Sequence, residues 1–333
     1  MQTRIDVIPL EELDEFSGLV HKAPSVPSPI QQLSMQMQEH WTWKTRDATT
    51  PPNLLVENPH NECRGLKSVE FNPTELCNRT CHFCPRVDPE VYPNRKLHMQ
   101  PETVQRVVDN LKEHSYCGKI VFSGMGEPTL NRKICELIKL CTDAGIYTEL
   151  VTNGDKIYQD KWYNIKDFID AGINHMHIDV YDNKEQLLNY IEMAKPYTKY
   201  ANFNITPRFL MATGMFNNRA GDVKHADIDS FGMAEPCMAP SVKAFIDWDG
   251  TVQLCCHDWQ RAGGNFGNVN EEKFSDIWNG ESMLKLRGRL MYNKRTNCGA
   301  PCNGCNTGGN IGDRKKAMQA WSLKIDKDQY STN

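Results

Sequence analysis

The sequence predicts an α/β protein: a partial (β/α)6 barrel of TIM-like layout, followed by a small cysteine-rich module. Between residues 68 and 210, short apolar runs alternate with amphipathic stretches of helix length. After residue 235 this alternation stops, and many of the 13 cysteines gather in the region that follows. We therefore expect four segments: an N-terminal arm or cap (1–65), the barrel (66–234), the cysteine-rich module (235–310) and a C-terminal tail (311–333).

The barrel region contains at least five strand–helix units. Strands are predicted at 68–74, 118–124, 147–153, 175–181 and 202–210. Helices are predicted at 101–114, 130–145, 160–172 and 183–195. Repeated units of this kind imply a parallel sheet with its chemistry at the carboxyl ends of the strands.

The segments on either side of the barrel read differently. Residues 1–65 are rich in Pro and Gln without a sustained period, which suggests an arm on the surface. VKAFIDWDGTVQLCC (242–256) predicts a hairpin with its turn at Asp249 and Gly250. Residues 314–333 read as a polar tail with one helical turn.

Composition and charge disfavour several classes of protein. The net charge is −4 and charges of both signs are interspersed, which disfavours a nucleic-acid partner. The short basic groups near Arg86, Arg95 and Lys96, and at 314–316, are read as solvated, which argues against a tRNA-modifying enzyme. There is no apolar run of membrane-spanning length and no signal-peptide core, so we expect a cytoplasmic protein without a membrane partner.

Three cysteines follow the first predicted strand in the segment LCNRTCHFCPR, at positions 77, 81 and 84. In a reducing compartment, clustered thiols indicate metal ligation more than disulfides. Three thiolates suit iron and sulfide, and they leave one iron of a four-iron cubane open to another ligand. The alternatives are a zinc knuckle completed by His82, or inert buried thiols.

This CxxxCxxC segment resembles the signature of the radical S-adenosylmethionine (SAM) superfamily. The glycine-rich motif of that family is matched by Ser123–Pro128, which contains Gly124, Gly126 and Glu127. The resemblance implies a [4Fe-4S] cluster held by Cys77, Cys81 and Cys84 that binds SAM. It also implies cofactor contacts from the loops and strand ends, by Phe83, Gly124, Gly126, Glu127, Asn153, Asp179, Tyr181 and Arg208. Ordinary turns, caps or a surface ion pair would explain several of these residues equally well.

A second set of cysteines resembles the C-terminal SPASM module in its shorter, single-cluster form, called twitch. Its expected ligands are Cys237, Cys255, Cys302 and Cys305, supported by NRAG (218–221), DGTVQLCC (249–256) and DIWNG (276–280). The resemblance implies one auxiliary [4Fe-4S] cluster, and a four-cysteine zinc site is the alternative. Cys256 and Cys298 do not belong to either expected ligand set. Each could be a substitute ligand, a buried small side chain or a donor of a hydrogen atom to a substrate radical.

The resemblance implies an enzyme that reductively cleaves SAM to a 5'-deoxyadenosyl radical and abstracts a substrate hydrogen atom. Flavodoxin or ferredoxin would supply the electron. We expect oxidation (dehydrogenation) or epimerisation of a carbohydrate-like or aminocyclitol-like substrate. The alternatives are modification of a peptide and, in a different class, a non-catalytic iron–sulfur or zinc-binding module.

Overall fold

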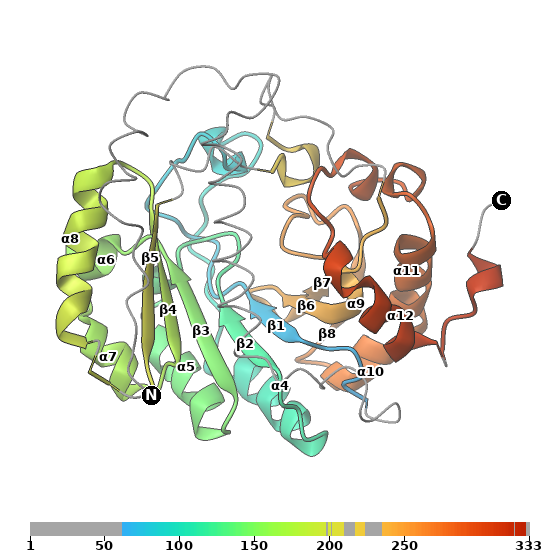
Figure 1. Cartoon of the computed structure of the whole chain (residues 1–333), viewed down its shortest axis with the longest axis horizontal. Helices are drawn as coiled ribbons and strands as arrows, with labels where there is room; N and C mark the ends of the chain where they lie inside the picture. The colour runs from blue at the N-terminus through green and yellow to red at the C-terminus, as the bar shows by residue number, and fades with distance from the viewer. Residues whose placement is uncertain are drawn as a thin grey trace.

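A curved sheet of eight strands forms the centre of the molecule (Figure 1). The computed structural model describes residues 62–197, 199–200, 202–209, 217–223, 235–322 and 324–330. Almost all of the predicted arm, 1–65, lies outside these residues. The strands are β1 (Ser68–Phe71), β2 (Lys119–Phe122), β3 (Tyr147–Thr152), β4 (His175–Val180), β5 (Asn204–Phe209), β6 (Lys243–Ile246), β7 (Thr251–Gln253) and β8 (Asn265–Asn268).

The first five strands confirm the predicted series of parallel strands. The order across the sheet is β5-β4-β3-β2-β1-β6-β7-β8, and β1 to β5 each pair in parallel with the next. Parallel neighbours need crossover connections, which the helices supply. All carboxyl ends therefore meet at one edge of the sheet.

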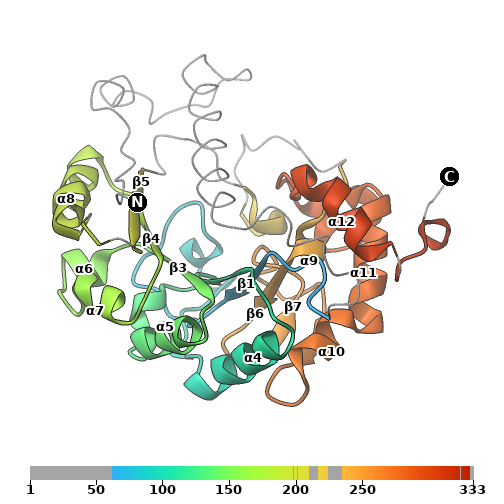
Figure 2. The same cartoon turned by 60° about the horizontal axis from the view of Figure 1, so that its bottom comes forward.

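Helices cover the outer face of this parallel part (Figure 2). They are α4 (Pro101–Glu113), α5 (Ile134–Asp143), α6 (Asp155–Tyr158), α7 (Ile165–Asp170) and α8 (Lys184–Ala194). The helix predicted at 160–172 starts later, because the Asn164 side chain accepts from the Asp167 amide and the Asp167 carboxylate accepts from the Asn164 amide. Phe71 and Phe122 stack at 5.5 Å between centroids in the buried core.

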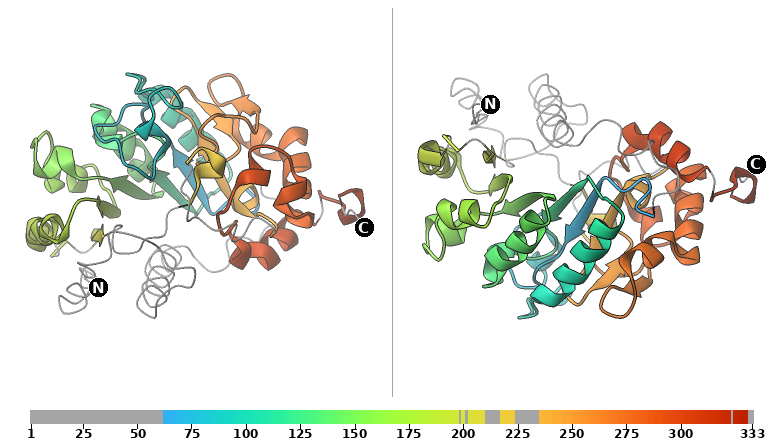
Figure 3. Two further views of the ribbon diagram at one scale, coloured as in Figure 1. Left: turned by 90° about the horizontal axis from the view of Figure 1, so that it is seen from above. Right: turned by 90° about the horizontal axis from the view of Figure 1, so that it is seen from below.

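The predicted hairpin is present, and its first strand also extends the barrel sheet. β6 pairs in parallel with β1 on one side and antiparallel with β7 on the other. Gly250 closes the turn with a φ of 87°, a conformation that glycine adopts without strain. The C-terminal helices α9 (Ala239–Val242), α10 (Phe274–Asn279), α11 (Glu281–Tyr292) and α12 (Arg314–Trp321) lie at this end of the sheet (Figures 1 and 3).

The C-terminal segment is more ordered than predicted. α12 has eight residues rather than one turn, and its Trp321 is fully buried against Trp278 with ring centroids 5.8 Å apart. Ala317, Ala320 and Trp321 share one face of the helix at i, i+3 and i+4. Three basic residues at the start of the helix, 314–316, make this segment look polar in the sequence, so the apolar stripe was not predicted. In the part of the chain that the structure describes, no helix is long and apolar enough to span a membrane.

Candidate functional site

The segment that follows β1 carries the three-cysteine motif. Cys77, Cys81 and Cys84 are all half-buried free thiols, and the Cys84 amide donates to the Cys81 carbonyl at 2.9 Å. Burial raises the pKa of Cys77 to about 12 and that of Cys81 to about 11. A nearby cationic metal centre would be needed to hold these thiols as thiolates at neutral pH.

Arg86 and Asn94 fix the shape of this loop. The Asn94 side chain accepts from the Cys77 amide at 2.9 Å and donates to the Cys77 carbonyl at 2.8 Å. The buried Arg86 guanidinium donates to the Met125 carbonyl at 2.8 Å, to Asn94 at 3.1 Å and to the Glu75 carbonyl. These bonds join the cysteine loop to the glycine-rich loop after β2.

Arg79, within the cysteine motif, clamps the loop to the ends of β3 and β4. Its guanidinium donates to both carboxylate oxygens of Asp155 at 2.7 Å. It also donates to Asp182 at 2.6 and 3.0 Å. Such bidentate pairs restrain orientation as well as distance. The sequence did not indicate this clamp, since its partners lie 76 and 103 residues away.

Two glycines of the GMGEP motif are required by close backbone approach. Gly124 has a φ of 102°, and a Cβ there would lie 2.5 Å from the Asn72 Oδ1 atom. A Cβ on Gly126 would lie 2.1 Å from the Thr74 carbonyl oxygen. The loop after β2 is therefore packed directly on the chain that leads to Cys77, and only glycine fits.

Glu127, expected to face the cofactor, has its carboxylate occupied by the protein. It is 3% exposed and accepts from the Thr129 hydroxyl and the Thr152 hydroxyl at 2.6 Å, and from the Asn153 amide at 2.8 Å. Desolvation raises its pKa even though these hydrogen bonds oppose the shift. Glu127 thus joins the ends of β2 and β3, and a contact of its carboxylate with a cofactor stays a prediction.

The other expected cofactor contacts surround the same loop. Asn153 donates to the Asn78 side chain at 3.0 Å. Phe83 and Tyr181 face each other with ring centroids 5.5 Å apart. Arg208 pairs with Asp179 at 2.6 Å, so its nearest anion here is a carboxylate of the chain itself. The structure gathers these predicted residues at the carboxyl ends of the strands, while their roles toward a cofactor stay predictions.

The second cysteine set also converges. Cys302 and Cys305 are buried, Cys237 and Cys255 are half-buried, and the Cys237 thiol is electrostatically coupled to those of the other three. Burial raises the pKa of Cys237 to about 11 and that of Cys302 to about 12. Arg295 donates to the Cys305 sulfur at 3.5 Å, and the Thr307 hydroxyl lies 3.3 Å from it.

The NRAG segment packs against this second set. Asn218 donates to the Gly304 carbonyl at 2.7 Å, and its amide donates to the Asn306 side chain at 2.8 Å. Figure 1 shows this gold segment and the cyan segment after β1 at the same end of the molecule. The two cysteine sets therefore face the same end of the sheet.

A buried polar network connects the two regions. Arg261 pairs with Glu75 and with Asp247, at 2.7 Å each. Asn72 donates to Glu75 at 3.0 Å and to Asp247 at 2.7 Å, and the Tyr92 hydroxyl donates to Glu75 at 2.7 Å. The network joins the cysteine loop to the hairpin of the cysteine-rich module, and no local pattern in the sequence predicts it.

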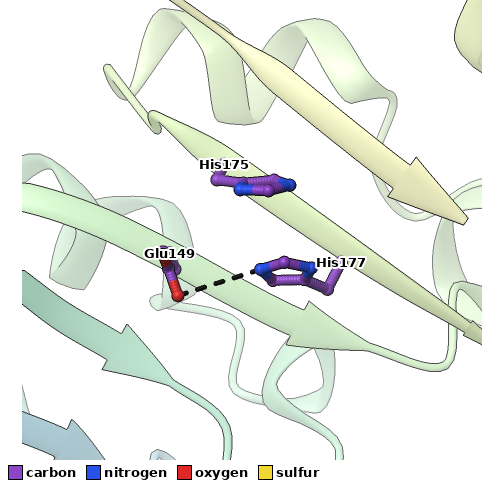
Figure 4. A group of neighbouring side chains, drawn as sticks. All are labelled: Glu149, His175 and His177. Atoms are coloured by element: carbon purple, nitrogen blue, oxygen red, sulfur yellow. Dashed lines mark ion pairs between the residues drawn. The ribbon is translucent and has the colours of Figure 1, made fainter. Parts of the chain in front are cut away.

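A further group of buried polar side chains lies on β3 and β4 (Figure 4). Glu149, His175 and His177 are at most 3% exposed, and their ligand atoms lie within 4.8 Å of one another. The sequence does contain a pattern that indicates a polar face on β4. It is the two-residue spacing of His175, His177 and Asp179, which puts the three side chains on one face of the strand.

The donor sets fit the cofactors that the sequence implied. Three free thiols within eight residues of one loop suit a cluster with an open iron, and four free, half-buried or buried thiols suit a closed ligand shell. Hydrogen bonds to the sulfur of Cys305 are the kind that tune iron–sulfur clusters. Two backbone positions that admit only glycine form the wall beside the first set.

Comparison with known proteins identifies the family. A family model described as "Radical SAM superfamily" matches residues 71–202, and a model described as "Iron-sulfur cluster-binding domain" (SPASM) matches residues 237–306, so together they cover more than half of the chain. The second model favours iron and sulfide over the four-cysteine zinc alternative. The chain's cofactors are thus S-adenosylmethionine and [4Fe-4S] clusters.

Individual relatives agree with this assignment. S-adenosyl-L-methionine-dependent 2-deoxy-scyllo-inosamine dehydrogenase of Niallia circulans is 25% identical over 72% of this chain and 92% of its own length. A PqqA peptide cyclase of Methylocella silvestris is 32% identical over 20% of this chain and 17% of its own length. The crystal structure of BtrN in complex with AdoMet and 2-DOIA shares the fold, with a TM-score of 0.60 and 22% identity over 73% of this chain and 93% of that chain. The chain belongs to the radical SAM superfamily and carries a C-terminal SPASM-type iron–sulfur module.

Proposed function

We propose that this enzyme dehydrogenates a secondary alcohol of a small carbohydrate-like or aminocyclitol-like substrate. One observation carries the proposal: a complete set of four protein thiols lies at the same end of the sheet as the three-thiol set. A cluster with a closed ligand shell has no site for substrate, so it suits the acceptance of an electron. The relative from Niallia circulans, similar over nearly its whole length, is named as a dehydrogenase of an aminocyclitol.

When bound and reduced at the first cluster, SAM supplies a 5'-deoxyadenosyl radical that can remove a hydrogen atom from an unactivated carbon. The task of this chain's own residues is positioning. The clamp from Arg79 to Asp155 and Asp182 holds the cysteine loop against the ends of β3 and β4. The ring of Tyr181, itself packed on Phe83, covers the same end of β4 and would help to exclude water there.

We propose Cys77, Cys81 and Cys84 as ligands of the first cluster, and Cys237, Cys255, Cys302 and Cys305 as ligands of a single auxiliary cluster. A flavodoxin or ferredoxin is the proposed electron donor. Modification of a peptide remains the second substrate class, and the residues of the arm that would bear on it lie outside the described part of the chain.

Epimerisation is a second candidate outcome, favoured by the surroundings of Cys256. A satellite cluster formed by Tyr92, Met125, Phe245 and Trp259 packs against both Cys84 and Cys256. A thiol that packs beside the first cysteine set could return a hydrogen atom to a substrate carbon, a step that a dehydrogenase does not need.

The test uses full-length protein reconstituted anaerobically with iron and sulfide. With dithionite and SAM, 5'-deoxyadenosine is expected from the wild type and not from Cys77→Ala. With 2-deoxy-scyllo-inosamine as the trial substrate, dehydrogenation gives a product two mass units lighter for each 5'-deoxyadenosine formed. A product that has the mass of the substrate in H2O and gains one deuterium in D2O would indicate epimerisation instead. Absence of 5'-deoxyadenosine from a fully loaded wild type would contradict the radical reaction itself.

A further inference from the structure

The face of the sheet opposite the helices is unusually polar at its centre. Side chains on successive strands β2 to β5 meet there, all at most 8% exposed: Lys119, Glu149, His175, His177 and Thr206. The residues that alternate with them, such as Leu150 and Met176, belong to the apolar core. Interiors of closed barrels are usually filled by branched apolar side chains. Polar groups at this depth therefore require polar partners.

The polar side chains form a connected but incomplete network. Lys119 pairs with Glu149 at 2.9 Å, and the His177 Nε2 atom lies 3.8 Å from the other Glu149 oxygen. The His175 Nε2 atom bonds the Thr206 hydroxyl at 2.9 Å, and the two imidazole rings lie 3.9 Å apart. The His175 Nδ1 atom, on a side chain 3% exposed, has no hydrogen-bond partner among the residues that the structure describes.

Two classes of ligand could form hydrogen bonds or coordinate bonds with this group of buried polar side chains. Two imidazoles and one carboxylate could bind a divalent metal ion. However, the Lys119 ammonium already occupies one oxygen of Glu149, and a metal ion would bring two further positive charges beside it in a buried site. Lys119 is a donor, Glu149 an acceptor, and each neutral imidazole offers one of each. Alternating donors and acceptors match hydroxyl groups, which both donate and accept.

We propose that Lys119, Glu149, His175, His177 and Thr206 form the subsite that binds the hydroxyl groups of a small polyhydroxylated substrate. His177 stands two residues before Asp179 on the same face of β4, about 7 Å further from the carboxyl end. A ligand of one ring could thus contact the subsite while its other edge faces the cofactor end. The inference deepens the proposed function by naming the residues that bind the substrate hydroxyl groups, and it rests on that function for the reaction but not for binding.

Binding is the direct test. Scyllo-inositol and 2-deoxy-scyllo-inosamine are titrated calorimetrically into the anaerobically reconstituted full-length holoenzyme with SAM present. At least one is expected to bind the wild type, and Glu149→Gln and His177→Gln are expected to weaken its binding about tenfold or more, since each removes a hydrogen bond to a charged or buried group. The double variant Lys119→Met/Glu149→Gln removes both charges and guards against misfolding of the single variant. Met176→Leu, on the same strand but the opposite face, is the control and is expected to bind within about twofold of the wild type.

Formation of 5'-deoxyadenosine, measured without any polyol, separates this inference from the proposed function. If the variants still form 5'-deoxyadenosine, radical generation does not depend on the subsite. Failure of polyol binding and failure of the radical reaction are therefore distinguishable. The inference is overturned if neither polyol binds the wild type, or if the variants bind as Met176→Leu does. It is also overturned if the holoenzyme takes up one equivalent of added Zn²⁺ that His177→Gln does not.

Discussion

The two cysteines left over from the ligand sets lie in different surroundings. Cys298 is 2% exposed, and its sulfur lies 3.4 Å from the Lys294 carbonyl and 3.7 Å from the Arg289 carbonyl, to which it donates. Cys256 is half-buried and packs, together with Cys84, against the satellite cluster. A thiol already donating to backbone carbonyls fills a structural role, whereas Cys256 shares its packing partners with Cys84 of the three-cysteine motif.

Single exchange of each cysteine for Ala tests this difference. Cys298→Ala is expected to lower stability by about 1–2 kcal/mol, from lost packing and hydrogen bonding, with turnover kept. If the reaction is an epimerisation, Cys256→Ala abolishes product while 5'-deoxyadenosine still forms. If it is a dehydrogenation, both variants keep turnover. Product mass and 5'-deoxyadenosine are measured in the same reaction, and loss of product only in Cys298→Ala would contradict the assignment.

His175 makes the stability of the fold depend on pH. Burial, together with the neighbouring His177, lowers the pKa of His175 well below its usual value near 6.5. Below pH 6.5 the unfolded chain binds a proton that the folded chain does not, so stability is complete above that value and falls as the pH decreases.

Urea unfolding of the anaerobic holoenzyme between pH 7.5 and 5.5 measures this effect. The wild type is expected to lose up to about 1.4 kcal/mol per pH unit below 6.5 through this residue. His175→Asn is expected to be less stable at pH 7.5 but to show a flatter pH dependence. Acid lability of the clusters affects both proteins alike, so parallel curves would contradict the prediction.

Among the elements, the cysteine loop depends on side chains brought from other strands. Arg79 reaches the segment after β3 and the segment after β4, and its guanidinium is largely buried by Asp155 and Asp182. Groups that orient metal ligands without binding the metal typically change metal affinity by about 10–100-fold when removed. We therefore expect Arg79 to position the proposed ligands of the first cluster.

Arg79→Met is expected to accelerate loss of the first cluster to a chelator about tenfold, while the auxiliary cluster is retained. Arg79→Lys keeps the charge but loses the bidentate geometry, so an intermediate rate is expected. The control is Lys139→Met, which removes an exposed pair with Asp143. Electron paramagnetic resonance of the reduced protein follows each cluster separately, and equal loss from both clusters would contradict a local role.

Local patterns predicted the elements better than their contacts. The alternation of short apolar runs with stretches of helix length was enough to predict β1 to β5, because each strand carries its own apolar run. The same reasoning underestimated α12, where three basic residues precede a short apolar stripe. The partners of Arg79 and Arg261 lie up to 186 residues away, and no local pattern encodes such pairs.

At the scale of the whole molecule, two domains that bind clusters are joined through one sheet. β6 of the C-terminal region pairs with β1, directly before the cysteine loop. The network around Arg261 adds a second connection, in which two almost fully buried carboxylates, Glu75 and Asp247, share one guanidinium. This arrangement fixes the cysteine loop relative to the auxiliary module, and with it the separation of the two proposed cluster sites.

Arg261→Met is expected to widen the range of distances between the two cluster sites. Removing one partner from a buried ion pair leaves two uncompensated carboxylates and lowers the free energy of unfolding by about 3–5 kcal/mol. Lys273→Met is the matched control. It breaks a pair with Glu113 that also joins the two regions but is exposed to solvent, so little change in stability is expected. Pulsed dipolar spectroscopy of the two reduced clusters should show a broader distance distribution in Arg261→Met alone.

The same variant should also form less product for each 5'-deoxyadenosine, since the substrate-derived electron must still reach the auxiliary cluster. An unchanged distance distribution with normal coupling would mean that the β1–β6 pairing alone holds the two domains together.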